Sequence, residues 1–132
     1  MKKILLTLLL VSSITFAADK KEYNLAEVMK TLEEATIKIL KGFLWDNDQW
    51  IIEGAHIIAN HPEPEGGMLK YVRPERRTQA FGKYLERLDK LVRETAQDIE
   101  TLTKHKKKGL AADRFNDMLK ACNSCHAVFR GW

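Results

Sequence analysis

Residues 110–130 read LAADRFNDMLKACNSCHAVFR, and this stretch indicates the fold class more clearly than any other part of the chain. Six side chains recur at spacings of three or four residues, which places them along one side of an α-helix: Phe115, Met118, Leu119, Cys122, His126 and Phe129. A helix with a single apolar side must bury that side against other elements. The rest of the chain should therefore supply partner helices.

Three earlier segments have the same periodicity, and we expect helices at about residues 24–41, from residue 46 or 48 to residue 60, and at about 74–106. Asn24 and Glu27 form a capping-box pair at the start of the first segment. Four amphipathic helices with mostly short connections predict an all-α fold, an antiparallel four-helix bundle.

Glycine and proline mark the expected helix ends. We expect Gly42 to end the first helix, Pro62 to stop the second, Pro74 to begin the third at its first position, and Gly109 to end it. Residues 62–67, with the sequence PEPEGG, are the one clear loop, and we expect this loop to extend to residue 73.

The composition narrows the alternatives. With 7 glycines and 3 prolines in 132 residues, the chain has too few turn formers for a loop-rich all-β protein. Two cysteines, three residues apart, do not make a disulfide-stapled scaffold. No pair of carboxylates, activated nucleophile or polar cleft can be argued from the sequence, so we do not expect an enzyme.

Residues 1–17 have the pattern of a secretory signal peptide: two lysines, an apolar stretch, and small residues at the cleavage-specifying positions Thr15 and Ala17. We therefore expect the functional domain to span residues 18–132, to be exported to the periplasm, and to have no stable membrane insertion after cleavage. Removal of the two lysines lowers the formal net charge from +4 to +2. The basic residues do not form the concentrated basic patch that nucleic-acid binding needs, so we expect no binding to nucleic acid.

Cys122, Cys125 and His126 form the sequence C-x-x-C-H, the signature of covalent c-type haem attachment. Two thiols add to the two vinyl groups of haem, and the two intervening residues set their separation. The adjacent histidine then supplies an imidazole to the iron. The sequence therefore predicts one covalent haem c with His126 as an iron ligand.

Three other interpretations of the two cysteines remain open at this stage. A thioredoxin-like redox pair needs a βαβ context, and nothing strand-like precedes the motif. A zinc site needs four ligands, and His56 and His61 have no cysteines beside them. A structural disulfide would be compatible only with a chain that lacks haem.

A haem on the last helix of a four-helix bundle resembles the cytochrome c-prime family, the class II cytochromes c. The resemblance covers residues 18–132 in architecture and rests in detail on residues 122–130. There, Phe129 and Arg130 match the aromatic and basic residues that the family shows three and four places after the histidine. Only six residues follow His126, whereas mitochondrial-type cytochromes c carry the motif near the N-terminus.

The resemblance implies that the first helix crosses the distal face of the haem. Some members of the family place a methionine ligand there, and others place a non-bonding side chain. On the inward stripe of the first helix here, Met29 is the only good iron ligand; core packing is the alternative role. Residues 25–32 also resemble the first helix of the soluble four-helix cytochrome b. Where many family members have a basic residue near a haem propionate, this chain has Leu25, so the propionate partners stay unassigned.

Other candidate ligands are less favourable. Met68 lies in the glycine-rich loop, and Met118 lies two turns before His126 on the same helix, so neither is expected to reach the opposite haem face. We expect His56 to face inward from the second helix as a partly buried side chain.

These observations predict a periplasmic c-type cytochrome that transfers one electron through a haem ligated by His126 and Met29. The alternative is a five-coordinate c-prime-like protein that binds NO or CO. As partners we expect periplasmic redox proteins; the chain could also form a homodimer.

Overall fold

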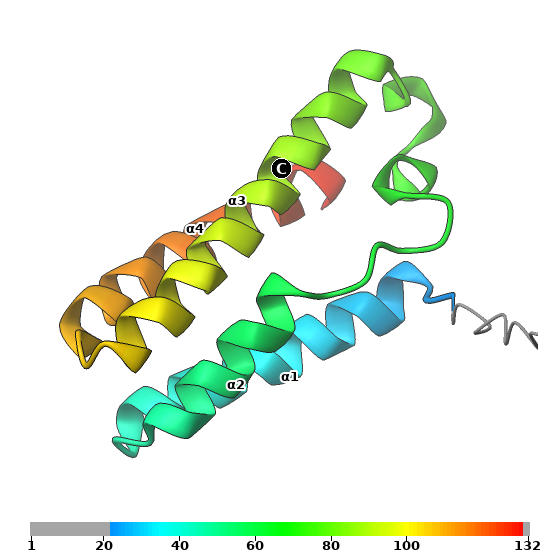
Figure 1. Ribbon diagram of the computed structural model, residues 1–132. Helices are drawn as coiled ribbons and strands as arrows, with labels where there is room; N and C mark the ends of the chain where they lie inside the picture. Colours follow the sequence, from blue (N-terminus) through cyan, green and yellow to red (C-terminus); the bar gives the residue numbers. More distant parts are fainter. Residues whose placement is uncertain (1–21, 131–132) are drawn as a thin grey trace, which may run out of the picture.

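The computed structural model describes residues 22–130, and within this range every regular element is helical. The predicted signal peptide, residues 1–17, lies outside the described residues. Four long helices and two short 3₁₀ helices follow one another along the chain (Figure 1): α1 (Leu25–Leu44), α2 (Asp48–Ala59), η1 (Met68–Tyr71), η2 (Pro74–Arg76), α3 (Gln79–Lys104) and α4 (Lys108–Arg130). The predicted all-α class and the four helices are confirmed.

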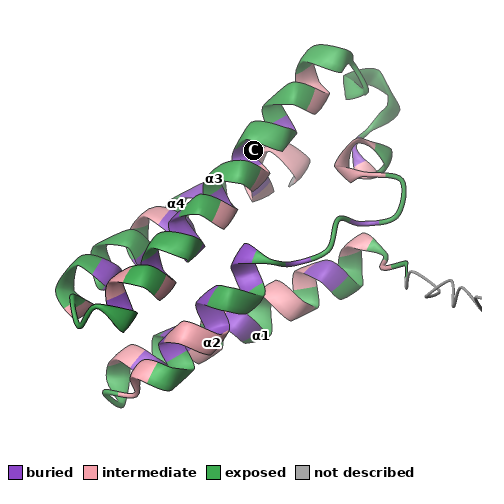
Figure 2. Cartoon of the chain, viewed as in Figure 1, coloured by how far each residue is buried: buried purple, intermediate pink, exposed green. Residues whose placement is uncertain are grey.

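Each helix packs on the next one along the chain. The antiparallel pairs α1–α2 and α3–α4 are joined through extensive contact of α2 with α3 (Figure 1). Figure 2 shows the buried residues gathered where these helices face one another. The core cluster draws on all four helices: Ala35, Ile39, Ile51, Ala55, Ile58, Ala59, Val92, Ala96, Ile99, Phe115, Met118 and Ala121.

The start of α1 matches the predicted capping box. The Asn24 side chain accepts a hydrogen bond from the Glu27 backbone N–H at 3.0 Å, and the Glu27 carboxylate accepts one from the Asn24 backbone N–H at 2.9 Å. Two backbone donors at the helix start are thereby satisfied. At the start of α2, the side chain of Asn47 caps the backbone N–H of Trp50.

The prediction that Gly42 ends the first helix is wrong, because α1 continues to Leu44. Gly42 lies inside the helix, where a methyl group in place of its hydrogen would come within 2.6 Å of Cγ1 of Ile51. The glycine therefore allows close packing of α1 on α2. The chain turns instead at Asp46, whose φ of 54° is left-handed.

The predicted start of the third helix at Pro74 is also wrong. Pro74 begins the short helix η2, and α3 starts at Gln79. The N-cap of α3 is Thr78, whose hydroxyl accepts a hydrogen bond from the Phe81 backbone N–H at 3.2 Å. A capping hydroxyl stabilises a helix start more than a proline several residues earlier does.

Gly109 lies inside α4 and does not end α3, which stops at Lys104. The turn between them is made by Lys106, which has a φ of 60°. Lys106 and Lys108 pair with opposite oxygens of Asp48, each at 2.7 Å. These ion pairs join the α3–α4 turn to the α1–α2 turn at one end of the bundle.

None of the helices between residues 22 and 130 has both the length and the apolar character that crossing a bilayer requires.

Candidate functional site

Cys122 and Cys125 lie on α4 and are both free thiols. Cys125 is buried and Cys122 is half-buried, whereas Asn123 and Ser124 between them are exposed. Residues three apart on a helix are neighbours on its surface. Helix geometry therefore presents both sulfurs to the inside of the bundle and the two intervening residues to solvent.

Both thiols are held in the protonated form. Burial raises the pKa of Cys125 to about 11, and the nearby Cys122 and Asp89 add to this effect. Burial also raises the pKa of Cys122. A redox-active dithiol has the opposite property, a thiol pKa lowered by a cationic or helix-N-terminal environment. In addition, residues 22–130 contain no strand for a thioredoxin-like context.

His126 follows Cys125 directly on α4 and is half-buried. Phe115, Cys122 and Phe129 recur at intervals of seven residues, so they share one face of the helix. His126 lies one turn after Cys122 on this face. The thiols and the imidazole are therefore presented together by the second half of α4.

Met29 lies on the same side of α1 as Phe43, next to the buried Val28. The marker for this face is Phe43, whose ring centroid lies 5.7 Å from that of Phe115 on α4. Met29 and Thr36 precede Phe43 at intervals of seven residues and so share its face. Met29 itself is half-buried.

Met29 and His126 also lie at the same end of the bundle, away from the phenylalanine contact. Met29 precedes Phe43 by about 21 Å along the helix axis, and His126 follows Phe115 by about 17 Å, at 1.5 Å per residue. Because α1 and α4 run antiparallel, the two candidate ligands differ in level by about one helical turn.

The core cluster named above ends close to these residues, and Val28 of α1, Leu85 of α3 and Cys125 of α4 are buried beyond it. Leu32 on α1 and Cys122 on α4 are partly buried side chains that pack against the core cluster from outside. Beyond this level α2 has ended (Figure 1), and α1 and α4 make no extensive contact with each other along their length.

The segment 60–78 closes this end of the molecule. The Glu65 backbone N–H donates to the Tyr23 carbonyl at 2.7 Å, just before α1, and the Arg76 guanidinium donates to the Val128 carbonyl of α4 at 3.1 Å. Arg77 holds the segment together by donating to the carbonyls of Val72 and Lys70. The segment therefore bridges the first and last helices around the cysteine motif.

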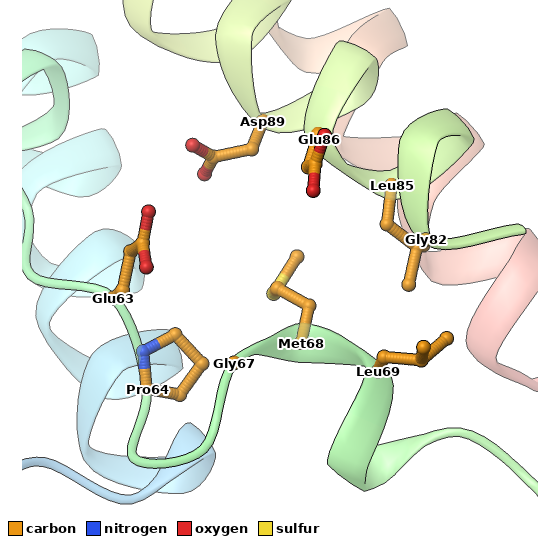
Figure 3. A pocket seen from close by; sticks show the side chains of 9 residues that line it. All are labelled: Glu63, Pro64, Gly67, Met68, Leu69, Gly82, Leu85, Glu86 and Asp89. Atoms are coloured by element: carbon orange, nitrogen blue, oxygen red, sulfur yellow. The ribbon is translucent and has the colours of Figure 1, made fainter. Parts of the chain in front are cut away.

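A cavity of about 200 Å³ lies between this segment and α3 (Figure 3). Its lining is apolar at Pro64, Met68, Leu69, Gly82 and Leu85, and acidic at Glu63, Glu86 and Asp89. The Met68 side chain points across the cavity towards α3 (Figure 3). Asp89, which lines the cavity, also acts electrostatically on the Cys125 thiol. Met68, expected to lie in the loop, faces α3 across this cavity (Figure 3).

The two histidines near the end of α2 lie in different environments. His56, expected to face inward, is exposed, and its Nδ1 lies 3.2 Å from Oε2 of Glu100. His61, in contrast, is only 7% exposed and contacts Asp89 and Arg93 of α3. Within residues 22–130, no three His, Cys, Asp or Glu side chains are grouped as a metal site would need. Met118 is fully buried in the core.

The buried contacts of His61 could have been anticipated from the sequence only through its charged partners on α3. Asp89 and Arg93 are four residues apart, beside the apolar positions Leu88 and Val92. Charged side chains at the edge of an apolar stripe indicate a polar partner on the facing element.

The residues present fit a covalently held haem in their donor chemistry: two inward thiols, an adjacent imidazole, and thioethers on the facing elements. Comparisons with family models, with curated proteins and with solved structures gave no match to this chain.

Proposed function

We propose that this protein is an exported c-type cytochrome that carries single electrons between periplasmic redox proteins. One observation carries the proposal: Cys122 and Cys125 face the bundle interior from α4, and the half-buried His126 follows directly after them. That arrangement is what covalent attachment of a flat prosthetic group between two helices requires. The bound haem would supply the reversible one-electron couple.

In this proposal each residue of the chain has a defined role. The sulfurs of Cys122 and Cys125 form thioether bonds and fix the haem to α4. The imidazole of His126 is the proximal iron ligand. The Met29 thioether would supply the second iron ligand, because Met29 lies on the Phe43 side of α1 and within about one turn of the level of His126. A haem held by both residues would supply a one-electron couple with little structural change.

Binding of NO or CO is a second candidate function, and the position of Leu32 favours it. Leu32 lies 11 residues before Phe43, the same number of residues that separate His126 from Phe115. An apolar side chain is therefore level with the proximal ligand. If Leu32 and not Met29 faced the iron, the sixth position would stay open to small uncharged ligands.

Absorption spectra of the purified haem-loaded protein distinguish the two functions. A low-spin ferric form with the weak far-red band of thioether ligation, together with a ferrous form that does not bind CO, is the result expected for the electron carrier. A high-spin ferric form and ready binding of CO would favour the gas-binding protein. Protein that carries no haem after export would contradict both.

A further inference from the structure

Positive charge is distributed unevenly over the molecule. Residues 70–87 carry six basic and two acidic side chains, whereas the other residues between 22 and 130 carry 12 basic and 15 acidic ones. We call residues 70–87 the basic segment. Its basic side chains are Lys70, Arg73, Arg76, Arg77, Lys83 and Arg87. The formal net charge is therefore +4 in this segment and −3 in the rest of the described chain.

The cations of the basic segment are accessible and lack counter-charges. All six of these residues are exposed. Lys70 pairs with Glu65, but none of the other five forms a salt bridge with a carboxylate between residues 22 and 130. Arg76 and Arg77 donate to backbone carbonyls, which carry no net charge. The described chain therefore leaves most of this positive charge available to a partner.

The basic segment lies at the same end of the bundle as the cysteine motif (Figure 1). Arg76 donates to the Val128 carbonyl of α4 at 3.1 Å. On α3, Arg87 lies 17 residues before the end of the helix, and on α4, Cys125 lies 17 residues after the start. Because α3 and α4 are antiparallel, Arg87 and Cys125 lie at about the same level of the bundle. The fold therefore gathers at the motif end cations that the sequence spreads over 18 positions.

The rest of the molecule has the opposite character. Residues 22–69, which include α1 and α2, carry three basic and nine acidic side chains. At the far end of the bundle, Lys106 and Lys108 are both paired with Asp48. A partner with an acidic surface is attracted by the basic segment and repelled by the acidic remainder. Such a field turns the motif end of the protein towards the partner before the two surfaces touch.

An exposed aromatic ring lies within the basic segment. Tyr84 is 41% exposed, and its ring is tilted against that of Phe81 with the centroids 6.3 Å apart. Tyr84 follows Lys83 directly and lies three residues before Arg87, so it borders both on the surface of α3. Tyrosine and arginine are enriched at protein–protein interfaces. The segment therefore combines charges that orient a partner with a ring that can contact it.

We propose that the basic segment is the surface on which this protein docks a redox protein with an acidic face. The inference rests on the proposed function. One electron passes between the two proteins; one of them is oxidised, the other is reduced, and no bond forms or breaks. A compact acidic protein is favoured over an extended polyanion, because a nucleic acid or an anionic bilayer would also face the acidic remainder of the molecule.

The first test is the rate of electron transfer from a reduced flavodoxin, used as a small redox protein with an acidic surface, to the haem-loaded protein. The rate constant should fall roughly tenfold as the ionic strength rises from about 10 mM to about 150 mM. Over this range the Debye length shortens from ~30 Å to ~8 Å, so the attraction is screened. A rate that does not depend on salt, or that rises with it, would overturn the proposal.

Two variants with equal changes in charge locate the surface. Lys83→Gln/Arg87→Gln removes two cations from the basic segment and should lower the rate at low salt several-fold and weaken its salt dependence. Lys41→Gln/Lys107→Gln is the matched control, since both lysines are exposed, form no salt bridge in the described chain, and lie at the opposite end of the bundle. The control should keep the wild-type rate. Equal effects of the two variants would show that net charge, and not this surface, governs the encounter.

Amide NMR of the reduced protein mixed with oxidised flavodoxin maps the contact without electron transfer. Shifts should centre on residues 70–87 and the end of α4, and should disappear at the higher salt. Shifts centred on α1 and α2 would overturn the proposal. So would binding to anionic vesicles or to single-stranded RNA in place of flavodoxin, each tested at the same low salt.

Haem retention is checked before either test. Protein without covalent haem contradicts the proposed function itself. Haem-loaded protein that shows no salt-dependent contact at the basic segment contradicts the docking surface alone.

Discussion

The rings of Phe43 on α1 and Phe115 on α4 pack with their centroids 5.7 Å apart and their planes tilted by 42°. This contact joins the first and last helices on the side of the core away from the cysteine motif. Met29 lies on the Phe43 side of α1, and His126 follows Phe115 on α4, so this contact relates the helices that carry the two candidate ligands. The proposal that Met29 and His126 hold the iron rests in part on this relation.

Met29→Leu should convert low-spin iron to high-spin, lower the reduction potential and open a site for CO. The thioether of methionine is a soft iron ligand, whereas leucine has similar bulk and cannot coordinate. The packing cost should be small, about 1 kcal/mol. Absorption spectra and a redox titration of the purified variant measure these changes.

Met68→Leu is the matched control, since Met68 is a half-buried methionine outside α1 that lines the cavity beside α3. It should leave the spin state and the potential unchanged. The opposite pattern, with a change in Met68→Leu alone, would transfer the ligand role to Met68. No change in either variant would leave both methionines as packing residues.

Gly54→Ala should destabilise the protein by about 1–3 kcal/mol, the usual cost of overpacking. The added methyl group would lie 2.7 Å from the Ala35 carbonyl oxygen and 2.7 Å from Cγ1 of Ile39, both on α1. Gly109→Ala serves as the control because, apart from its chain neighbours and the adjacent helix backbone, no atom lies within 4 Å of the added methyl group. There, the higher helix propensity of alanine should stabilise α4 by up to about 1 kcal/mol. Urea unfolding of the haem-loaded variants measures both effects, and equal effects would refute the close α1–α2 contact.

Asp89→Asn should lower the stability at pH 7 and weaken the loss of stability in acid. The folded protein lowers the pKa of Asp89, so its carboxylate stabilises the fold above its unfolded pKa of about 4. This stabilisation is lost as the pH falls through the folded pKa. The wild type should therefore lose more stability than the variant between about pH 4 and lower pH values.

Asp98→Asn is the control for this change. Asp98 pairs with Arg114 at 3.3 Å, but both side chains are about half exposed. Such pairs contribute at most about 1 kcal/mol. Denaturant midpoints at pH 7 and in acid measure the difference in stability. If Asp89→Asn loses as much stability in acid as the wild type does, then His61 and Arg93 do not hold the Asp89 carboxylate in its charged form.

The four helices were predictable because each has an apolar stripe of helical period, and that pattern is local. Several helix ends were not predictable from this pattern. Gly42 lies inside α1, where it packs closely against Ile51 of α2. The start of α3 depends on Thr78, whose hydroxyl accepts a hydrogen bond from the Phe81 backbone N–H. These are contacts between residues that the periodic pattern does not relate.

The same reason separates the site residues that sequence could find from those it missed. Cys122, Cys125 and His126 are adjacent in sequence, so their spacing is visible without a fold. His61 and Asp89 are 28 residues apart, and only the packing of α2 on α3 brings them together. The approach of Met68 to α3 depends likewise on the path of the segment 60–78.

The central claim is covalent attachment of haem through Cys122 and Cys125, and the most direct test is the intact mass of the exported protein after extraction with acidified organic solvent. We expect the mass of the chain from residue 18 plus one haem, and the mass of the chain alone in Cys122→Ala/Cys125→Ala. Recovery of the wild-type chain free of haem, with haem in the organic phase or absent, would contradict the account.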